Sequence, residues 1–180
     1  MSGKCGICHE KLGIFSRSHT CSKCGVKLCH SCSKKIDVED VNPITEAIMQ
    51  HFGIYNFRVS SFLGQFRGYE YFCPKCMRIF NNAQSTIDSL LNRADSVIGY
   101  SSNYKGRKPA CSDRVLYKTD FYKNRDDAMR EIKTAALYRG FKFVMDYSFV
   151  KETSEEETDS GGTYYYATWR VVGFLARSSN

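Results

Sequence analysis

The chain lacks any long apolar run. Among its 180 residues, no apolar stretch approaches the roughly 18 residues that a membrane-spanning helix requires. We also expect no secretory segment, because Met1–Lys4 is followed at once by the first cysteine. We therefore expect a cytoplasmic protein whose thiols stay reduced rather than forming a disulfide framework.

The sequence also lacks the short motifs of several common enzyme classes. It contains no phosphate-binding loop, no dinucleotide-binding fingerprint and no serine nucleophile elbow. No Cys/His/Asn arrangement surrounds Cys111, the one unpaired cysteine, so we interpret it as a spare thiol rather than a nucleophile. These absences favour a protein that is not an enzyme.

Cysteine, by contrast, is abundant and regularly spaced. Eight of the nine cysteines form four Cys-x-x-Cys pairs: Cys5/Cys8, Cys21/Cys24, Cys29/Cys32 and Cys73/Cys76. A two-residue gap lets two thiolates bind one metal ion from a single turn, and a four-cysteine zinc site needs two such turns. The four pairs therefore predict two structural Zn²⁺ sites, which four thiolates each would close to water and substrate.

The spacing alone leaves the pairing of the four turns open. The sites could be interleaved, with the first and third pairs on one ion, or sequential, with the first and second pairs on one ion.

The segment Cys5-Gly-Ile-Cys8-His9 also matches a c-type haem attachment motif, but that chemistry normally follows export. With eight thiolates present, no histidine is needed as a ligand, so we expect surface or supporting roles for His9, His19, His30 and His51.

The charge balance does not favour nucleic acid as a partner. The formal net charge is +7, but eight zinc-bound thiolates and two Zn²⁺ ions would reduce it to about +3. No Lys/Arg-rich run is present either. We therefore expect no nucleic-acid binding.

The chain divides by composition into a cysteine-rich first part and an aromatic last part. We predict a double zinc finger over 1–80, a connecting helix and linker over 81–110, and a small α+β domain over 111–180. In the first part, Asn42-Pro43 is typical of a helix start and Gly53 of its end. Residues 57–72 are predicted to form a hairpin with a turn near Gly64 or Gly68.

The second half is predicted to contain two helices and three strands. Apolar residues at helical spacing predict a helix over 83–98, and a polar linker follows over 101–109. The last domain is predicted to run strand, helix, strand, strand. These elements are a strand over 115–122, a helix over 125–139 that Asn124 caps, a strand over 141–149 and a strand over 163–175. We interpret the acidic segment 151–162 as a mobile loop.

The cysteine spacing resembles that of the FYVE zinc finger over residues 5–76. The gaps between the pairs are 12, 4 and 40 residues, and the short second gap is shared with the family. Gly25 and Leu28 match its Cys-Gly step and its following hydrophobic position. The resemblance implies an interleaved cross-brace fold. In that fold Cys5, Cys8, Cys29 and Cys32 hold the first zinc, and Cys21, Cys24, Cys73 and Cys76 hold the second.

FYVE domains bind phosphatidylinositol 3-phosphate at endosomal membranes, and the resemblance implies Arg17, His19 and Lys23 as candidate headgroup contacts. Much of the family's basic motif is missing, however. The usual Trp-x-x-Asp is absent. Ser18, Thr20 and Ser22 stand where the family prefers basic residues or histidine, and Tyr71-Phe72-Cys73 replaces its Arg-Val-Cys. A phosphate site needs several convergent donors. We therefore expect an adaptor module that binds a protein partner, with phosphoinositide binding as the alternative.

Two further resemblances complete the expectations. RING-type ubiquitin ligase fingers also interleave two zinc ions, but they usually include a histidine ligand, and all eight positions here are cysteine. Residues 110–177 resemble the YbjQ-like heavy-metal-binding family in Ala128, Ala135, Ala136, Arg139-Gly140, Gly161-Gly162 and the strand end Val171–Ala176. That resemblance implies a small α/β unit that forms a homo-oligomer through exposed aromatics of the last strand. Those aromatics could instead be core residues or cross-strand pairs.

Overall fold

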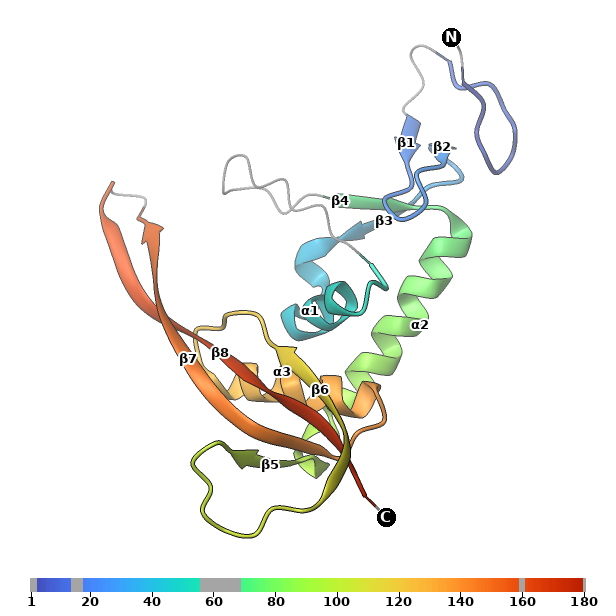
Figure 1. Ribbon diagram of the computed structural model, residues 1–180. Helices are drawn as coiled ribbons and strands as arrows, with labels where there is room; N and C mark the ends of the chain where they lie inside the picture. Colours follow the sequence, from blue (N-terminus) through green and yellow to red (C-terminus); the bar gives the residue numbers. More distant parts are fainter. Residues whose placement is uncertain (1–2, 14–17, 56–68, 159–160, 180) are drawn as a thin grey trace. The chain divides into compact units, whose positions relative to one another are not determined.

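The chain folds into two compact units of mixed helix and strand, an α+β arrangement. The computed structural model describes residues 3–13, 18–55, 69–158 and 161–179 (Figure 1). The first unit spans Met1–Thr86 and the second spans Ile87–Asn180. The segment 81–110, which was expected to connect them, contains the end of one helix and a strand of the four-stranded sheet in the second unit.

The first unit contains two small antiparallel ladders that frame the cysteines. Strands β1 (Ser18–Thr20) and β2 (Lys27–Cys29) pair with each other. Strand β3 (Lys34–Asp37) pairs with β4 (Tyr69–Phe72), in a register that sets Lys34 opposite Phe72. The predicted hairpin over 57–72 falls mostly outside the described residues, and its last four residues pair with 34–37.

Helix α1 (Pro43–His51) confirms the prediction made from Asn42-Pro43. The Asn42 side chain accepts a hydrogen bond from the Ile44 amide, and Pro43 occupies the first helical position, where its missing N–H costs nothing. Gly53, just past the end, has φ +63°, a left-handed conformation that favours glycine. A short 3₁₀ turn, η1 (Val38–Asp40), precedes the helix.

Helix α2 (Pro74–Leu91) corrects the predicted helix over 83–98 at both ends. It begins nine residues earlier because the turn of the fourth cysteine pair is itself the first turn of the helix, with the Met77 amide donating to the Cys73 carbonyl at 2.9 Å. Beyond Leu91 the chain forms a 3₁₀ turn, η2 (Ala94–Ser96), and then strand β5 (Ile98–Ser101). Ile98 is 53% exposed, so it does not continue the apolar helix face.

The core of the first unit is small and aromatic. Tyr55, Phe72 and Phe80 are buried, with ring centroids 4.9 to 5.8 Å apart. Ile48 and Met49 of α1 are fully buried as well. The other buried apolar side chains of this unit are Leu12, Leu28, Val38, Val41, Ile44 and Ala47.

The second unit is a four-stranded sheet with one helix packed on it. The strand order is β5-β7-β8-β6, in which β5 is parallel to β7 and the other neighbours are antiparallel. Strand β6 (Cys111–Lys118) begins and ends four residues before the predicted strand 115–122. Helix α3 (Arg125–Tyr138) follows the prediction, and the Asn124 side chain accepts from the Asp127 amide at its start.

One face of α3 packs against the sheet (Figure 1). Its buried apolar side chains are alanine at three of four positions, so the helix lies close to the strands. These helix side chains are Ala128, Ile132, Ala135 and Ala136. The buried residues of the sheet include Val144 of β7 and Val171 and Leu175 of β8.

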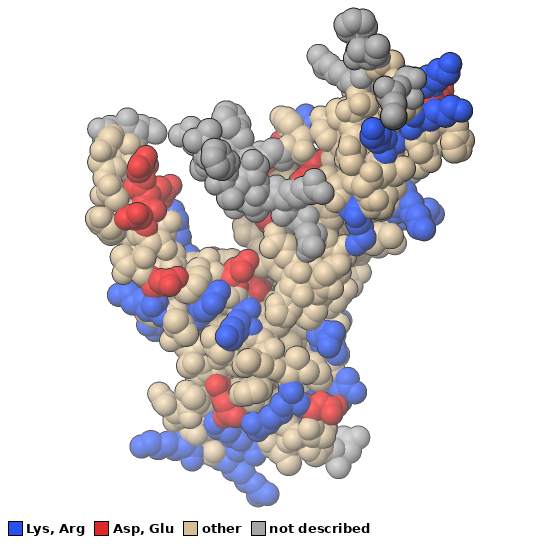
Figure 2. All heavy atoms as spheres, turned by 45° about the horizontal axis from the view of Figure 1, so that its top comes forward, with Lys and Arg blue, Asp and Glu red and all other residues tan. Residues whose placement is uncertain are grey.

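The acidic segment after residue 150 is strand rather than loop, which corrects the prediction for 151–162. Strand β7 (Phe143–Glu157) and strand β8 (Thr163–Ser178) continue as a hairpin, with Glu157 opposite Thr163. The partners of the glutamates are strong strand formers: Tyr164, Tyr165 and Thr168 lie opposite Glu156, Glu155 and Glu152. Acidic side chains gather towards the free end of this hairpin (Figure 2).

A buried glutamate joins α3 to the strand and loop beside it. Glu131 is 1% exposed and accepts three hydrogen bonds, from the Tyr117 hydroxyl at 2.8 Å, the Tyr122 hydroxyl at 2.8 Å and the Asp120 amide at 2.9 Å. Burial raises the pKa of Glu131 to about 7, although the three donors oppose that shift. The sequence pattern did not indicate this cluster, because its members are spaced irregularly along the chain.

Candidate metal centres

The four Cys-x-x-Cys pairs share one local geometry. In each, the amide of the residue after the second cysteine donates to the carbonyl of the first. The donors are His9, Gly25, Ser33 and Met77, and the N···O distances run from 2.8 to 3.1 Å. His9 and Gly25 have positive φ, of 62° and 75°. This closed turn aims both sulfurs of a pair in one direction, as a shared metal ion requires.

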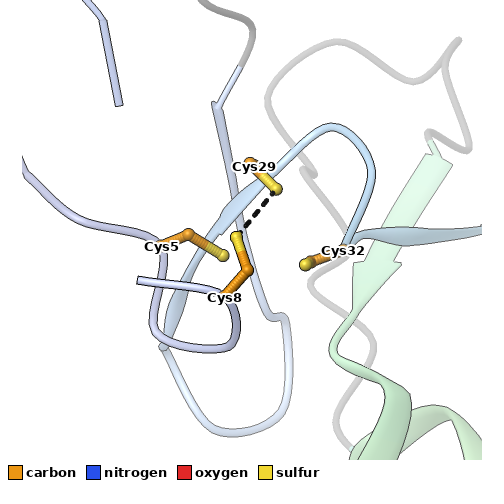
Figure 3. Close-up of side chains that lie close together, drawn as sticks. All are labelled: Cys5, Cys8, Cys29 and Cys32. Atoms are coloured by element: carbon orange, nitrogen blue, oxygen red, sulfur yellow. Dashed lines mark hydrogen bonds between the residues drawn. The ribbon is translucent and has the colours of Figure 1, made fainter. Parts of the chain in front are cut away.

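The turns assemble into two groups of four sulfurs. In the first group, the side chains of Cys5, Cys8, Cys29 and Cys32 point into one common space (Figure 3). The second group consists of Cys21, Cys24, Cys73 and Cys76. Within each group all sulfur atoms lie within 4.8 Å of one another.

The sulfur spacing fits a tetrahedral metal ion and not a disulfide. Zn²⁺ bound by four thiolates at about 2.3 Å places neighbouring sulfurs about 3.8 Å apart. The Cys8 and Cys29 sulfurs are 3.7 Å apart, and those of Cys24 and Cys73 are 3.9 Å apart. All nine cysteines are free thiols in this structure. Each group could therefore hold one metal ion.

The β1–β2 hairpin explains why the groups are interleaved rather than sequential. Cys21 and Cys24 lie in its turn, whereas Cys29 is the last residue of β2. A three-residue strand spans about 10 Å, so the second and third pairs cannot meet at one ion.

Backbone hydrogen bonds bring each pair to its partner instead. The Gly6 amide donates to the Lys27 carbonyl at 2.8 Å, which sets the first pair beside the third. The Ser22 amide donates to the Tyr71 carbonyl at 2.9 Å, which sets the second pair beside the fourth. The two bonds thus join segments that are distant in sequence into two four-sulfur groups.

The electrostatics of the first group favour metal binding. The amides of Cys8 and Cys29 point at the Cys5 sulfur and lower the pKa of Cys5 to about 6. The neighbouring sulfur of Cys29 raises the pKa of Cys32 to about 12. One thiolate therefore forms readily, but crowded sulfurs resist losing the remaining protons unless a cation balances the charge.

The second group is the more buried of the two. Cys21, Cys73 and Cys76 are buried, and only Cys24 is exposed. Backbone amides, first that of Cys24, lower the pKa of Cys21 to about 7 against the opposing effect of burial, whereas burial raises the pKa of Cys76. The Cys76 amide also donates to the Cys73 sulfur at 3.4 Å.

Two of the three candidate lipid contacts, His19 and Lys23, are engaged in contacts within the fold. Arg17 lies outside the described residues. The His19 ring stacks on the Tyr71 ring with centroids 3.7 Å apart. The Lys23 ammonium donates to the Ile54 carbonyl.

The remaining sequence candidates lie outside the two groups. His9, His30 and His51 contribute no ligand to either group, and the His51 ring meets the Phe52 ring edge-on, with centroids 5.1 Å apart. The Cys111 sulfur donates weakly to the Pro109 carbonyl at 3.6 Å. Among the described helices, none combines the length and apolar character needed to cross a bilayer.

The chain matches no family model, and no curated protein or solved structure is significantly similar to it. The sequence pattern and the cysteine geometry therefore carry the functional argument.

Sequence reasoning missed the ladder that supports the second group. Strand β3 reads Lys34-Lys35-Ile36-Asp37, with no apolar alternation to indicate a strand. Its pairing with β4 nevertheless places the segment after Cys32 directly beside the segment before Cys73. The sequence feature that could have indicated this pairing is that the two segments lie next to Cys32 and Cys73, which were predicted to be ligands.

Proposed function

We propose that the chain is a non-enzymatic interaction module, a cytoplasmic adaptor whose first unit is a FYVE-like double zinc finger. The observation that carries the proposal is the pair of interleaved four-sulfur groups with tetrahedral spacing. An all-thiolate tetrahedral set suits Zn²⁺, and it leaves no open coordination position for catalysis. The metal ions are then structural, and the surface around them is the functional part.

A protein partner, rather than a phosphoinositide, is the ligand that we assign to this module. Two contacts support this assignment: Lys23 is held by the Ile54 carbonyl, and His19 is stacked on Tyr71. Neither side chain can turn to a phosphate without losing its present contact. A phosphoinositide site in this unit would therefore have few of the convergent donors that it needs.

Vesicle flotation separates the two assignments. We expect the zinc-loaded protein to stay at the bottom of the gradient with vesicles that contain phosphatidylinositol 3-phosphate, as it does with vesicles that lack this lipid. Flotation that needs the lipid and is lost in Arg17→Ala and Lys23→Ala, but kept in Lys75→Ala, would establish the lipid function instead. Lys75 is exposed on α2 and is a matched cationic control.

A further inference from the structure

The first unit carries a cleft that is separate from both sulfur groups and from the candidate lipid contacts. Its volume is about 470 Å³, and its lining comes from the start of β3 and one face of α2: Lys34, Pro74, Met77, Arg78, Asn81 and Asn82. All of these residues belong to the first unit. Along α2 the lining runs from residue 74 to residue 82, about 12 Å at 1.5 Å per residue.

The metal ligands fix both walls of the cleft. Lys34 lies two residues after Cys32, a ligand of the first group, and it is paired with Phe72 in the β3–β4 ladder. The α2 wall begins at Pro74, between Cys73 and Cys76 of the second group. Metal binding at the two groups therefore holds Lys34 at a set position opposite the first turns of α2.

Among the residues that the structure describes, neither Lys34 nor Arg78, the two cations of the cleft, forms an ion pair. Both are exposed, as are Asn81 and Asn82, whereas Met77 is half-buried. Two cations with no acidic neighbour in contact attract a negatively charged ligand.

The composition of the lining favours a polypeptide over a compact phosphate group. A carboxylate can bind the Arg78 guanidinium through two parallel hydrogen bonds. The amides of Asn81 and Asn82 can each donate and accept, which suits the main chain of an extended segment. Met77 and Pro74 supply an apolar surface for a neighbouring side chain, which a phosphate would leave unused.

We propose that this cleft binds an acidic polypeptide segment of the partner, with Arg78 and Lys34 receiving its carboxylates and Met77 contacting an adjacent apolar side chain. The proposal deepens the proposed function and rests on it, because the metal-bound turns hold the two walls together. The expected partner is a protein that presents a short extended segment with aspartate or glutamate beside an apolar residue.

Selection from a random dodecapeptide library displayed on phage tests the proposal with the full zinc-loaded chain. We expect the selected peptides to be rich in Asp and Glu and to carry an apolar residue among them. A synthetic peptide from the selected pool should bind at least tenfold more weakly to Arg78→Glu and to Lys34→Glu than to the wild type. Lys75→Glu, on the same helix but outside the cleft, should bind as the wild type does. Raised salt should weaken binding as well.

The outcomes separate this proposal from the proposed function. Native mass of each variant, giving two zinc ions per chain, shows that the finger is intact. A selected pool with no acidic bias, or binding that survives both cleft substitutions in zinc-loaded protein, overturns the cleft assignment and leaves the zinc module standing. Binding of phosphatidylinositol 3-phosphate vesicles that Arg78→Glu abolishes, without peptide binding, assigns the cleft to a lipid instead. Wild-type protein that folds without zinc contradicts the proposed function itself.

Discussion

Replacement of Cys24 with serine is expected to unfold the first unit and to release zinc. Cys24 is the exposed member of the second group, so serine fits at this position without steric conflict. Any loss of folding or of zinc therefore results from the missing thiolate. Structural Zn²⁺ contributes roughly 10–16 kcal/mol at neutral pH, more than the roughly 5–15 kcal/mol of net stability typical of a folded domain. Weakening of one site should therefore abolish folding of this unit rather than merely lower its melting temperature.

Zinc content by native mass spectrometry and far-ultraviolet circular dichroism measure the effect of this change. Trp169, the one tryptophan, lies in β8 of the second unit, so its emission reports whether that unit stays folded. Cys111→Ser is the matched control, because Cys111 belongs to neither group. Full zinc content and an unchanged dichroism spectrum in Cys24→Ser would show that the Cys24 thiolate is not a required ligand of a structural metal ion.

Removal of the Glu131 side chain is expected to produce the largest loss of stability in the second unit. In Glu131→Ala, the buried Tyr117 hydroxyl, the half-buried Tyr122 hydroxyl and the Asp120 amide lose their shared acceptor. An unsatisfied buried donor costs about 1–3 kcal/mol, so a loss of about 3–5 kcal/mol in the free energy of unfolding is expected. Urea unfolding followed by Trp169 emission measures it. A loss below about 1 kcal/mol would contradict the structural role of this cluster.

The same residue predicts how the stability of the second unit depends on pH. Burial raises the pKa of Glu131 from 4.5 to about 7 in the folded chain. Between these values the folded state keeps a proton that the unfolded state has lost, so stability falls as pH rises through this window and is constant above it. The decrease from pH 5 to pH 8 is about 3 kcal/mol, at 1.36 kcal/mol per unit of pKa.

A Glu131→Gln variant separates this ionisation from other titrations in the unit. Gln keeps the size and one acceptor of the side chain but cannot ionise, so its stability should change little between pH 5 and pH 8. Urea unfolding at both pH values, followed by Trp169 emission, gives the comparison. If wild type and variant show the same pH dependence, Glu131 is not the titrating group.

The structural features that were predicted well from the sequence are those that depend on residues a few positions apart. Asn42 and Asn124 cap α1 and α3 because a side-chain acceptor near a helix start satisfies an amide that has no other partner. The two-residue gaps between cysteines likewise set the turn geometry directly. The two metal groups could therefore be anticipated, and their interleaving followed from the family resemblance rather than from the spacing.

The elements that the sequence did not predict depend on contacts between distant segments. Strand β3 is polar and exists through its pairing with β4, about 35 residues later in the chain. The acidic half of β7 looks like a loop by composition, yet its partners in β8 are tyrosines and threonines that favour a strand. Helix α2 began earlier than predicted because a cysteine turn and a helix turn coincide at Cys73–Met77.

The central claim is that two metal ions, each bound by four thiolates, hold the first unit together. Native mass spectrometry of the protein purified under reducing conditions tests it most directly, since it gives the metal, its stoichiometry and the assembly mass. We predict two zinc ions per chain, with loss of both on chelation and concurrent loss of structure in the first unit. A chain that carries one ion or none, or whose cysteines are joined as disulfides, would contradict the account.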